Sequence, residues 1–141
     1  MLTSQEFSSA LRMHGYKVTP QRLAVYEALA NTRSHPNAEA LFQQLQLKYP
    51  SMSFATVYKT IEILQKLHLI QVLNLGEDSY RYDADTTPHH HLQCTCCGRV
   101  EDITLADSSF LIQQAEAQSG YALQGHLFYF FGLCPDCSQN N

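Results

Sequence analysis

Residues 53–83 read SFATVYKTIEILQKLHLIQVLNLGEDSYRYD, and this stretch decides the fold of the first half of the chain. Ser53 is a residue type that caps helices, and an apolar stripe at helical spacing follows it: Phe54, Val57, Ile61 and Leu64. Two extended runs, residues 70–75 and 79–83, then flank Gly76-Glu77-Asp78 and predict a hairpin. The stretch therefore predicts a helix followed by a two-stranded hairpin.

Three further helices are predicted upstream of this stretch. Ser4 can cap the first, and Thr19-Pro20 supplies a capping hydroxyl and a first-turn proline for the second. Pro36-Asn37 starts a third helix, which Tyr49-Pro50 stops. Helices that precede a hairpin are the winged-helix pattern, so residues 1–83 are predicted to be a winged-helix domain that binds double-stranded DNA.

The polar face of the fourth helix, opposite the apolar stripe, suits the major groove of DNA. Tyrosine, threonine and lysine side chains can hydrogen-bond phosphate or contact a thymine methyl group. A solvated helix face has the same pattern, and the hairpin together with the basic residues upstream favours DNA over that interpretation. The predicted DNA-binding residues are Lys17, Arg22, Thr56, Tyr58 and Lys59.

Charge divides the 141-residue chain unevenly. The net charge is -4, but residues 1–82 carry 8 Lys+Arg against 6 Asp+Glu, whereas residues 83–141 carry 1 against 7. The first part can therefore face phosphates, and the second suits cations. Neither part would bury much core unaided, and both a bound metal and dimerisation would compensate.

The second half of the chain is predicted to combine short strands with one helix. Strands are expected at residues 91–94 and 99–103, a helix at 107–118, and one or two strands within 121–133. The run Phe128-Tyr129-Phe130-Phe131 is apolar on both faces, so we expect it to be buried in a sheet shared across a homodimer. The predicted fold class is α+β: a winged-helix domain (1–83), a hinge (84–88) and a small α/β dimerisation domain (89–141).

Four cysteines form two Cys-x-x-Cys pairs, which indicate a structural zinc site. Such pairs on tight turns can aim four sulfurs at one Zn2+ ion. Redox dithiols or disulfides are the alternative, which a cytosolic chain disfavours. Cys96 is then a bystander or redox-active thiol, because pairing Cys94 with Cys97 keeps Gly98 directly after the second sulfur. The predicted zinc ligands are Cys94, Cys97, Cys134 and Cys137.

We expect a cytoplasmic protein without a membrane partner. Phe7 and Leu11 near the start of the chain are interrupted by Glu6, Arg12 and Lys17, which is not the pattern of a secretory signal.

A second metal cluster is predicted around the histidine run. His89 and His91 lie two residues apart, so in a strand both project to one face and His90 to the other. Aspartates before and after this segment can complete a site, and an N-terminal histidine could close on it from the other domain. Nitrogen and oxygen ligands favour iron(II), manganese(II) or zinc over copper(I). The predicted ligands are His35, Asp83, His89, His91 and Asp102.

Several segments together resemble the ferric uptake regulator family. The matching segments are residues 17–22 (KVTPQR), 35–39 (HPNAE), 55–60 (ATVYKT) and 89–98 (HHHLQCTCCG), and the match runs in order from about residue 5 to Cys137. The resemblance implies a homodimeric, metal-dependent repressor in which a structural zinc sits on the four cysteines and a regulatory metal sits at the hinge. Both predicted ligand sets and the DNA-binding positions agree with it.

The resemblance also bears on a third metal and on the signal that is sensed. Some members hold a further metal, for which His90 and His126 are the matching ligands, although Pro88 and Ser109 replace the histidine and glutamate found there. Aspartate at both Asp83 and Asp102 is typical of the peroxide-sensing branch. In that branch iron(II) reacts with peroxide and a ligand histidine is oxidised, which here implies His35 or His89.

Three functional hypotheses follow. The first is a repressor that senses peroxide, with an iron-responsive repressor of metal-uptake genes as the alternative and a zinc- or manganese-responsive repressor after it. The second is a metalloenzyme, since a His/Asp site with an open position can activate water or peroxide. Against it, the sequence shows no glycine loop for a substrate and no glutamate beside paired helical histidines, so we expect no enzyme. The third is a zinc-stapled module that binds protein alone.

Overall fold

The computed structural model describes residues 1–76 and 79–139, and the chain divides into two compact units, Met1–Thr86 and Thr87–Asn141. The division falls within residues 84–88, the segment expected to be a hinge. Its role as a hinge stays a prediction. Within the described residues, no helix has both the length and the apolar character that crossing a bilayer requires.

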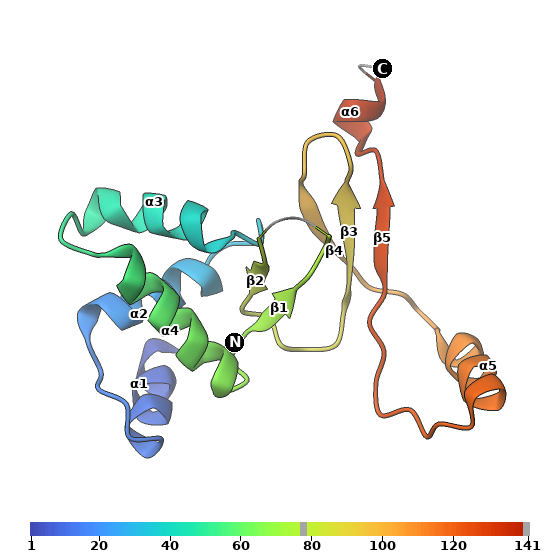
Figure 1. The fold of residues 1–141 in the computed structure, drawn as a ribbon, viewed down its shortest axis with the longest axis horizontal. Helices are drawn as coiled ribbons and strands as arrows, with labels where there is room; N and C mark the ends of the chain where they lie inside the picture. The colour runs from blue at the N-terminus through green and yellow to red at the C-terminus, as the bar shows by residue number, and fades with distance from the viewer. Residues whose placement is uncertain (77–78, 140–141) are drawn as a thin grey trace. The chain divides into compact units, whose positions relative to one another are not determined.

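Four helices and a two-stranded sheet form the first unit (Figure 1). Its helices are α1 (Ser4–Met13), α2 (Pro20–Ala30), α3 (Ala38–Lys48) and α4 (Phe54–Lys66). Strands β1 (Gln71–Leu73) and β2 (Arg81–Asp83) pair antiparallel, with Val72 opposite Tyr82. The predicted winged-helix pattern is confirmed, although residues 77 and 78 of the predicted turn lie outside the described residues.

Local hydrogen bonds explain where these helices begin. Three side chains that directly precede a helix each accept a backbone N–H from its first turn: Thr19, Asn37 and Ser53. The prediction that Ser4 caps α1 is wrong. Thr3 is the cap, because its hydroxyl accepts the Glu6 N–H while the Glu6 carboxylate accepts the Thr3 N–H at 2.7 Å.

The buried face of α4 holds the helices of the first unit together. Val57, Ile61 and Leu64 are at most 2% exposed and belong to one core with residues of α1, α2 and α3. One expectation needs correction. Phe54 is 38% exposed, and its ring lies edge-on to Phe42 rather than in the core stripe. Thr60 is also buried, and its hydroxyl donates to the Thr56 carbonyl at 2.7 Å.

A three-stranded sheet and two helices form the second unit. Strand β3 (His90–Cys94) lies in the middle, antiparallel to β4 (Val100–Ile103) and parallel to β5 (Tyr129–Gly132), as Figure 1 shows. Helix α5 (Ser109–Ser119) buries none of its residues in the single chain, and α6 (Pro135–Gln139) follows β5. Helix α6 was not predicted from the sequence.

The aromatic run occupies the edge of this sheet. Of the segment predicted as one or two strands, only Tyr129–Gly132 forms a strand, and residues 120–128 have no regular structure. Phe130 and Phe131 are 38% and 57% exposed. Within the described residues of the single chain β5 pairs with β3 alone, so burial of this run in a sheet shared across a homodimer stays a prediction.

Replacement of Leu64 tests the role assigned to the α4 core face. Leu64→Ala should lower the free energy of unfolding by about 2–5 kcal/mol, because a fully buried leucine leaves a cavity when it is truncated. Tyr58→Phe, on the same helix at a residue that is 45% exposed, should leave it within about 0.5 kcal/mol of wild type. Chemical denaturation of both variants measures the difference. Equal destabilisation would contradict the assignment of the two faces.

Candidate metal centres

The cysteine cluster is built from a turn and the start of a short helix. Cys94 ends β3, and the chain turns back at Gly98, whose φ of 73° lies in the left-handed region that glycine adopts without strain. The Gly98 N–H donates to the Cys94 carbonyl at 2.9 Å and closes the turn. Cys134 directly precedes α6, and Cys137 lies within it. The Thr95 N–H donates to the carbonyl of Gly132 at the end of β5.

The four predicted sulfur ligands lie together at a spacing that suits zinc. One ligand atom from each of Cys94, Cys97, Cys134 and Cys137 lies within 4.8 Å of the others. A tetrahedral site with Zn–S bonds of about 2.3 Å requires sulfurs about 3.8 Å apart. The Cys97 and Cys134 sulfurs are 3.9 Å apart. Cys96, which is exposed, lies outside this group.

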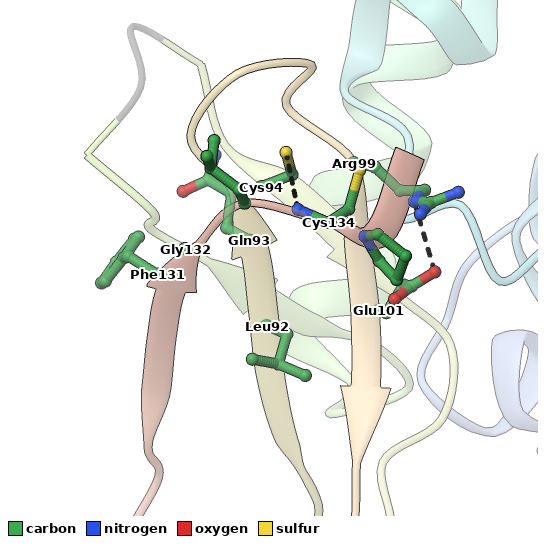
Figure 2. A pocket seen from close by; sticks show the side chains of 10 residues that line it. Leu92, Gln93, Cys94, Arg99, Glu101, Phe131, Gly132 and Cys134 are labelled. Atoms are coloured by element: carbon green, nitrogen blue, oxygen red, sulfur yellow. Dashed lines mark hydrogen bonds and ion pairs between the residues drawn. The ribbon is translucent and has the colours of Figure 1, made fainter. Parts of the chain in front are cut away.

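Backbone amides prepare Cys94 to act as a thiolate. The Cys134 N–H donates to the Cys94 sulfur at 3.3 Å, the interaction drawn in Figure 2. Hydrogen bonds from the backbone of Cys97 and then of Cys134 lower the pKa of Cys94 to about 6. Since metals bind the deprotonated sulfur, these amides favour the ligand form of Cys94 near neutral pH.

A histidine and aspartate group lies on the same sheet. The Nε2 atoms of His89 and His91 lie 3.4 and 3.8 Å from the same Oδ1 atom of Asp102. The rings of His89 and His91 are neighbours, with centroids 4.5 Å apart and planes tilted by 59°, as expected for residues two apart on one face. His89 Nδ1 lies 2.8 Å from the Thr87 carbonyl, an arrangement in which Nδ1 donates and Nε2 keeps its lone pair for a metal.

The other two predicted ligands come together in the first unit. His35 Nε2 lies 3.5 Å from Asp83 Oδ2, and both side chains are buried. His35 has a φ of 48°, which is uncommon for a residue with a side chain. Strand β2 holds it there, because the Tyr82 N–H donates to the Pro36 carbonyl at 3.1 Å and Arg81 Nη1 donates to the His35 carbonyl at 3.4 Å. Strain of this kind gathers at functional sites.

The two histidines predicted for a third metal are neighbours on the opposite face of β3. The ring centroids of His90 and His126 are 5.3 Å apart. His126 Nε2 lies 2.8 Å from the Ser108 hydroxyl, and the Phe128 N–H donates to His90 Nδ1 at 3.4 Å. Burial, and then His126, lower the pKa of His90, so the neutral imidazole is favoured. Two imidazoles and a hydroxyl are a sparse ligand set.

The residues predicted to contact DNA lie in the first unit: Thr56, Tyr58 and Lys59 in the N-terminal part of α4, Arg22 in the first turn of α2, and Lys17 just before α2. Tyr58 and Lys59 are exposed, whereas the hydroxyls of Thr56 and Ser53 are hydrogen-bonded to each other at 2.9 Å. The Arg22 guanidinium donates to the carbonyl of Lys17, so the two basic residues lie together.

Two features of these centres could not be predicted from the sequence. Tyr129 stacks on His91 with a centroid separation of 5.9 Å, which depends on the parallel pairing of β5 with β3. Arg99 bridges to Asp136 of α6, a helix that was not predicted. Neither contact leaves a local signal in the sequence, because both join segments that are distant along the chain.

Comparison with known proteins agrees with this geometry. The family model described as "Ferric uptake regulator family" matches residues 13–131. The "Transcriptional regulator PerR" of Clostridium acetobutylicum is 42% identical over 132 residues, covering 94% of this chain and 96% of that protein. The "Peroxide operon regulator" of Bacillus subtilis is 33% identical over 135 residues, covering 96% and 93%.

A solved structure shares the fold. The Helicobacter pylori ferric uptake regulator superposes with a TM-score of 0.79 at 24% identity, covering 95% of this chain and 90% of that one. This chain belongs to the ferric uptake regulator family.

Proposed function

We propose that this chain is a metal-dependent transcriptional repressor that releases DNA in response to peroxide. The observation that carries the proposal is the identity of the carboxylates beside the histidines. Both are aspartates, Asp83 and Asp102, as in the peroxide-sensing branch of the family. The names of the relatives in Clostridium acetobutylicum and Bacillus subtilis support the same branch.

The four cysteines are proposed to hold a structural Zn2+ ion. Their sulfur spacing fits a tetrahedral site, and the set leaves no open position for a substrate, which is the pattern of structural rather than catalytic zinc. The sheet of the second unit is small, and α5 buries no residue, so a metal staple supplies stability that packing in the single chain does not.

The regulatory metal, iron(II) or manganese(II), is proposed to bind two half-sites at once. His89, His91 and Asp102 form one half in the second unit, and His35 and Asp83 form the other in the first. Neither half alone completes a coordination sphere of five or six ligands, so a metal that binds both would fix the first unit against the second. That constraint would select one spacing of the DNA-reading helices.

Peroxide sensing is proposed to act through the histidines of this site. Iron(II), when bound, supplies the electron that reduces peroxide to a strong oxidant. We expect the imidazoles of His35 and His89 to gain oxygen and to lose the geometry that metal binding requires. The metal would then no longer fix the first unit against the second. The protein consumes its own side chain and turns over no substrate, which is the behaviour of a sensor rather than an enzyme.

A cytoplasmic homodimer that binds a double-stranded DNA operator is proposed as the active form. The exposed side chains of β5 and α5, including Phe110, Leu111 and Phe131, give the second unit an apolar surface that a second copy would cover. Two copies would present two α4 helices to half-sites about one helical turn apart.

Cysteine replacement tests the structural zinc. Cys94→Ser and Cys137→Ser should each lose one zinc per chain and unfold the second unit at lower temperature, because metal binding there contributes directly to folding. Cys96→Ser is the matched control and should keep its zinc, since this thiol lies outside the cluster. Zinc content by atomic absorption and thermal melting are the measurements. A Cys94→Ser protein with full zinc and unchanged melting would rule out the assignment.

Replacements in the first unit test DNA binding. Arg22→Ala should weaken binding to all DNA sequences, because it removes a phosphate contact. The slope of the logarithm of the binding constant against the logarithm of the salt concentration should become shallower by about one. Tyr58→Phe should also weaken binding, and both variants should keep their metals. Lys66→Gln, at the other end of α4, is the control for loss of charge and should bind like wild type. Gel shifts with and without metal at several salt concentrations are the test, and unaltered shifts for the first two variants would place the reading surface elsewhere.

Peroxide treatment tests the sensing mechanism. The iron-loaded protein should gain one oxygen atom on His35 or His89 and leave its operator, whereas the manganese-loaded protein should be spared and stay bound, because manganese(II) is a poor one-electron donor to peroxide. Peptide mass spectrometry and gel shifts of the same samples measure both events.

The exposed His68 is the internal control in that experiment. Equal oxidation of His68 would indicate an oxidant in bulk solution rather than at the site. Oxidation confined to cysteines, or DNA release without iron, would contradict peroxide sensing and leave the iron-responsive repressor as the function.

A further inference from the structure

Arg99 is the one lysine or arginine among residues 83–141, where seven aspartates and glutamates lie. Its position next to the cysteine cluster is therefore the only place in this part of the sequence where a permanent positive charge is supplied. The side chain is 42% exposed, so it is neither buried in the core nor fully solvated.

Arg99 joins three parts of the second unit. Arg99 directly precedes β4, and its Nε atom lies 3.3 Å from Glu101 Oε1 on that strand, an ion pair that Figure 2 shows. Its Nη1 atom lies 3.1 Å from Asp136 Oδ2 in α6. Its backbone carbonyl accepts the Cys94 N–H at 2.8 Å. The guanidinium is thus held between β4 and the helix that carries Cys137.

The charge of the cysteine cluster gives this position its importance. Four thiolates around one Zn2+ ion carry roughly two negative charges. Arg99 lines the same cavity as Cys94 and Cys134, so it is a neighbour of two of the four proposed zinc ligands.

The surroundings on this side of the cluster strengthen the attraction. A cavity of about 150 Å³ reaches Cys94 and Cys134. Figure 2 shows that Leu92 and Phe131 line it together with Arg99 and Glu101. Apolar walls screen charges less than water does, so the guanidinium acts on the sulfurs more strongly than an arginine in open solvent would.

We propose that Arg99 is the charge-compensating residue of the structural zinc centre, where it stabilises the four-thiolate form and slows the loss of zinc. The inference rests on the proposed zinc site. It extends that proposal by assigning a residue outside the ligand set to the retention of the metal.

A purely mechanical role is the competing explanation. In that case Arg99 serves to tie α6 to β4 through Asp136, and the charge on the cluster is irrelevant. The two roles make opposite predictions for Asp136→Asn. Loss of the tie would speed zinc release, whereas removal of an anion beside a negatively charged cluster would slow it or leave it unchanged.

The test is the rate at which zinc leaves the full-length, zinc-loaded protein in excess EDTA, measured as the zinc that remains after desalting. Arg99→Gln should release zinc about tenfold faster than wild type, the size expected for a group that supports a ligand shell. Arg99→Lys should stay close to wild type, because the charge is kept. Arg33→Gln, an exposed arginine of the first unit, is the matched control and should not change the rate.

High salt and the Asp136→Asn variant distinguish charge compensation by Arg99 from a purely mechanical tie between α6 and β4. In roughly 1 M salt, where the Debye length is about 3 Å, the difference between Arg99→Gln and wild type should shrink. The proposal would be overturned if Arg99→Gln and wild type released zinc at equal rates at low salt. It would also be overturned if Asp136→Asn released zinc as fast as Arg99→Gln. If Arg99→Gln fails to fold, the Asp136→Asn and Arg99→Lys rates still decide. Wild type purified without zinc would instead defeat the zinc assignment itself.

Discussion

Strand β3 is the constraint on which both candidate metal centres of the second unit depend. It is the central strand, paired with β4 and β5, and it carries His91 near its start and Cys94 at its end. Three residues of extended chain separate these side chains by about 10 Å. A shift of the β3–β4 register by one residue would turn His91 away from Asp102, the residue opposite it, and at the same time alter the cysteine turn. One set of backbone hydrogen bonds therefore aligns a sulfur site and a nitrogen–oxygen site.

The first unit positions its two predicted ligands with a strained backbone at His35 and with strand β2. His35 occupies the left-handed region directly before a proline, and the cost of such a conformation is on the order of 1–3 kcal/mol. Hydrogen bonds from β2 to residues 35 and 36 offset that cost. The same strand ends in Asp83, so the hairpin that defines the winged helix also sets the distance between His35 and Asp83.

Much of the first unit could be predicted because its signals are local. Thr19 and Ser53 cap helices through hydrogen bonds that span three residues, and the apolar period of α4 describes a face that the single chain buries. The second unit was harder to predict. Its sheet order joins β3 to a strand 38 residues later in sequence, as the His91–Tyr129 pair shows. The ligand clusters could still be predicted, since Cys-x-x-Cys and alternating histidines carry their geometry in their spacing. Arg99 could not, because its partner lies on a helix too short to leave a periodic pattern.

The separation of the two ligand types has a thermodynamic reason. Divalent zinc binds nitrogen and oxygen ligands more tightly than manganese(II) or iron(II) does, so a site of histidines and aspartates has no intrinsic preference for the weaker metals. A sulfur cluster whose thiolates are stabilised by backbone amides and, as proposed, by Arg99 takes zinc at far lower free concentration. Zinc bound there would contribute to the free energy of folding and would not exchange as a signal. With the proposed metals, the softer site would fix the structure with the metal that cannot change oxidation state, and the harder site would be left to metals that can exchange or donate an electron.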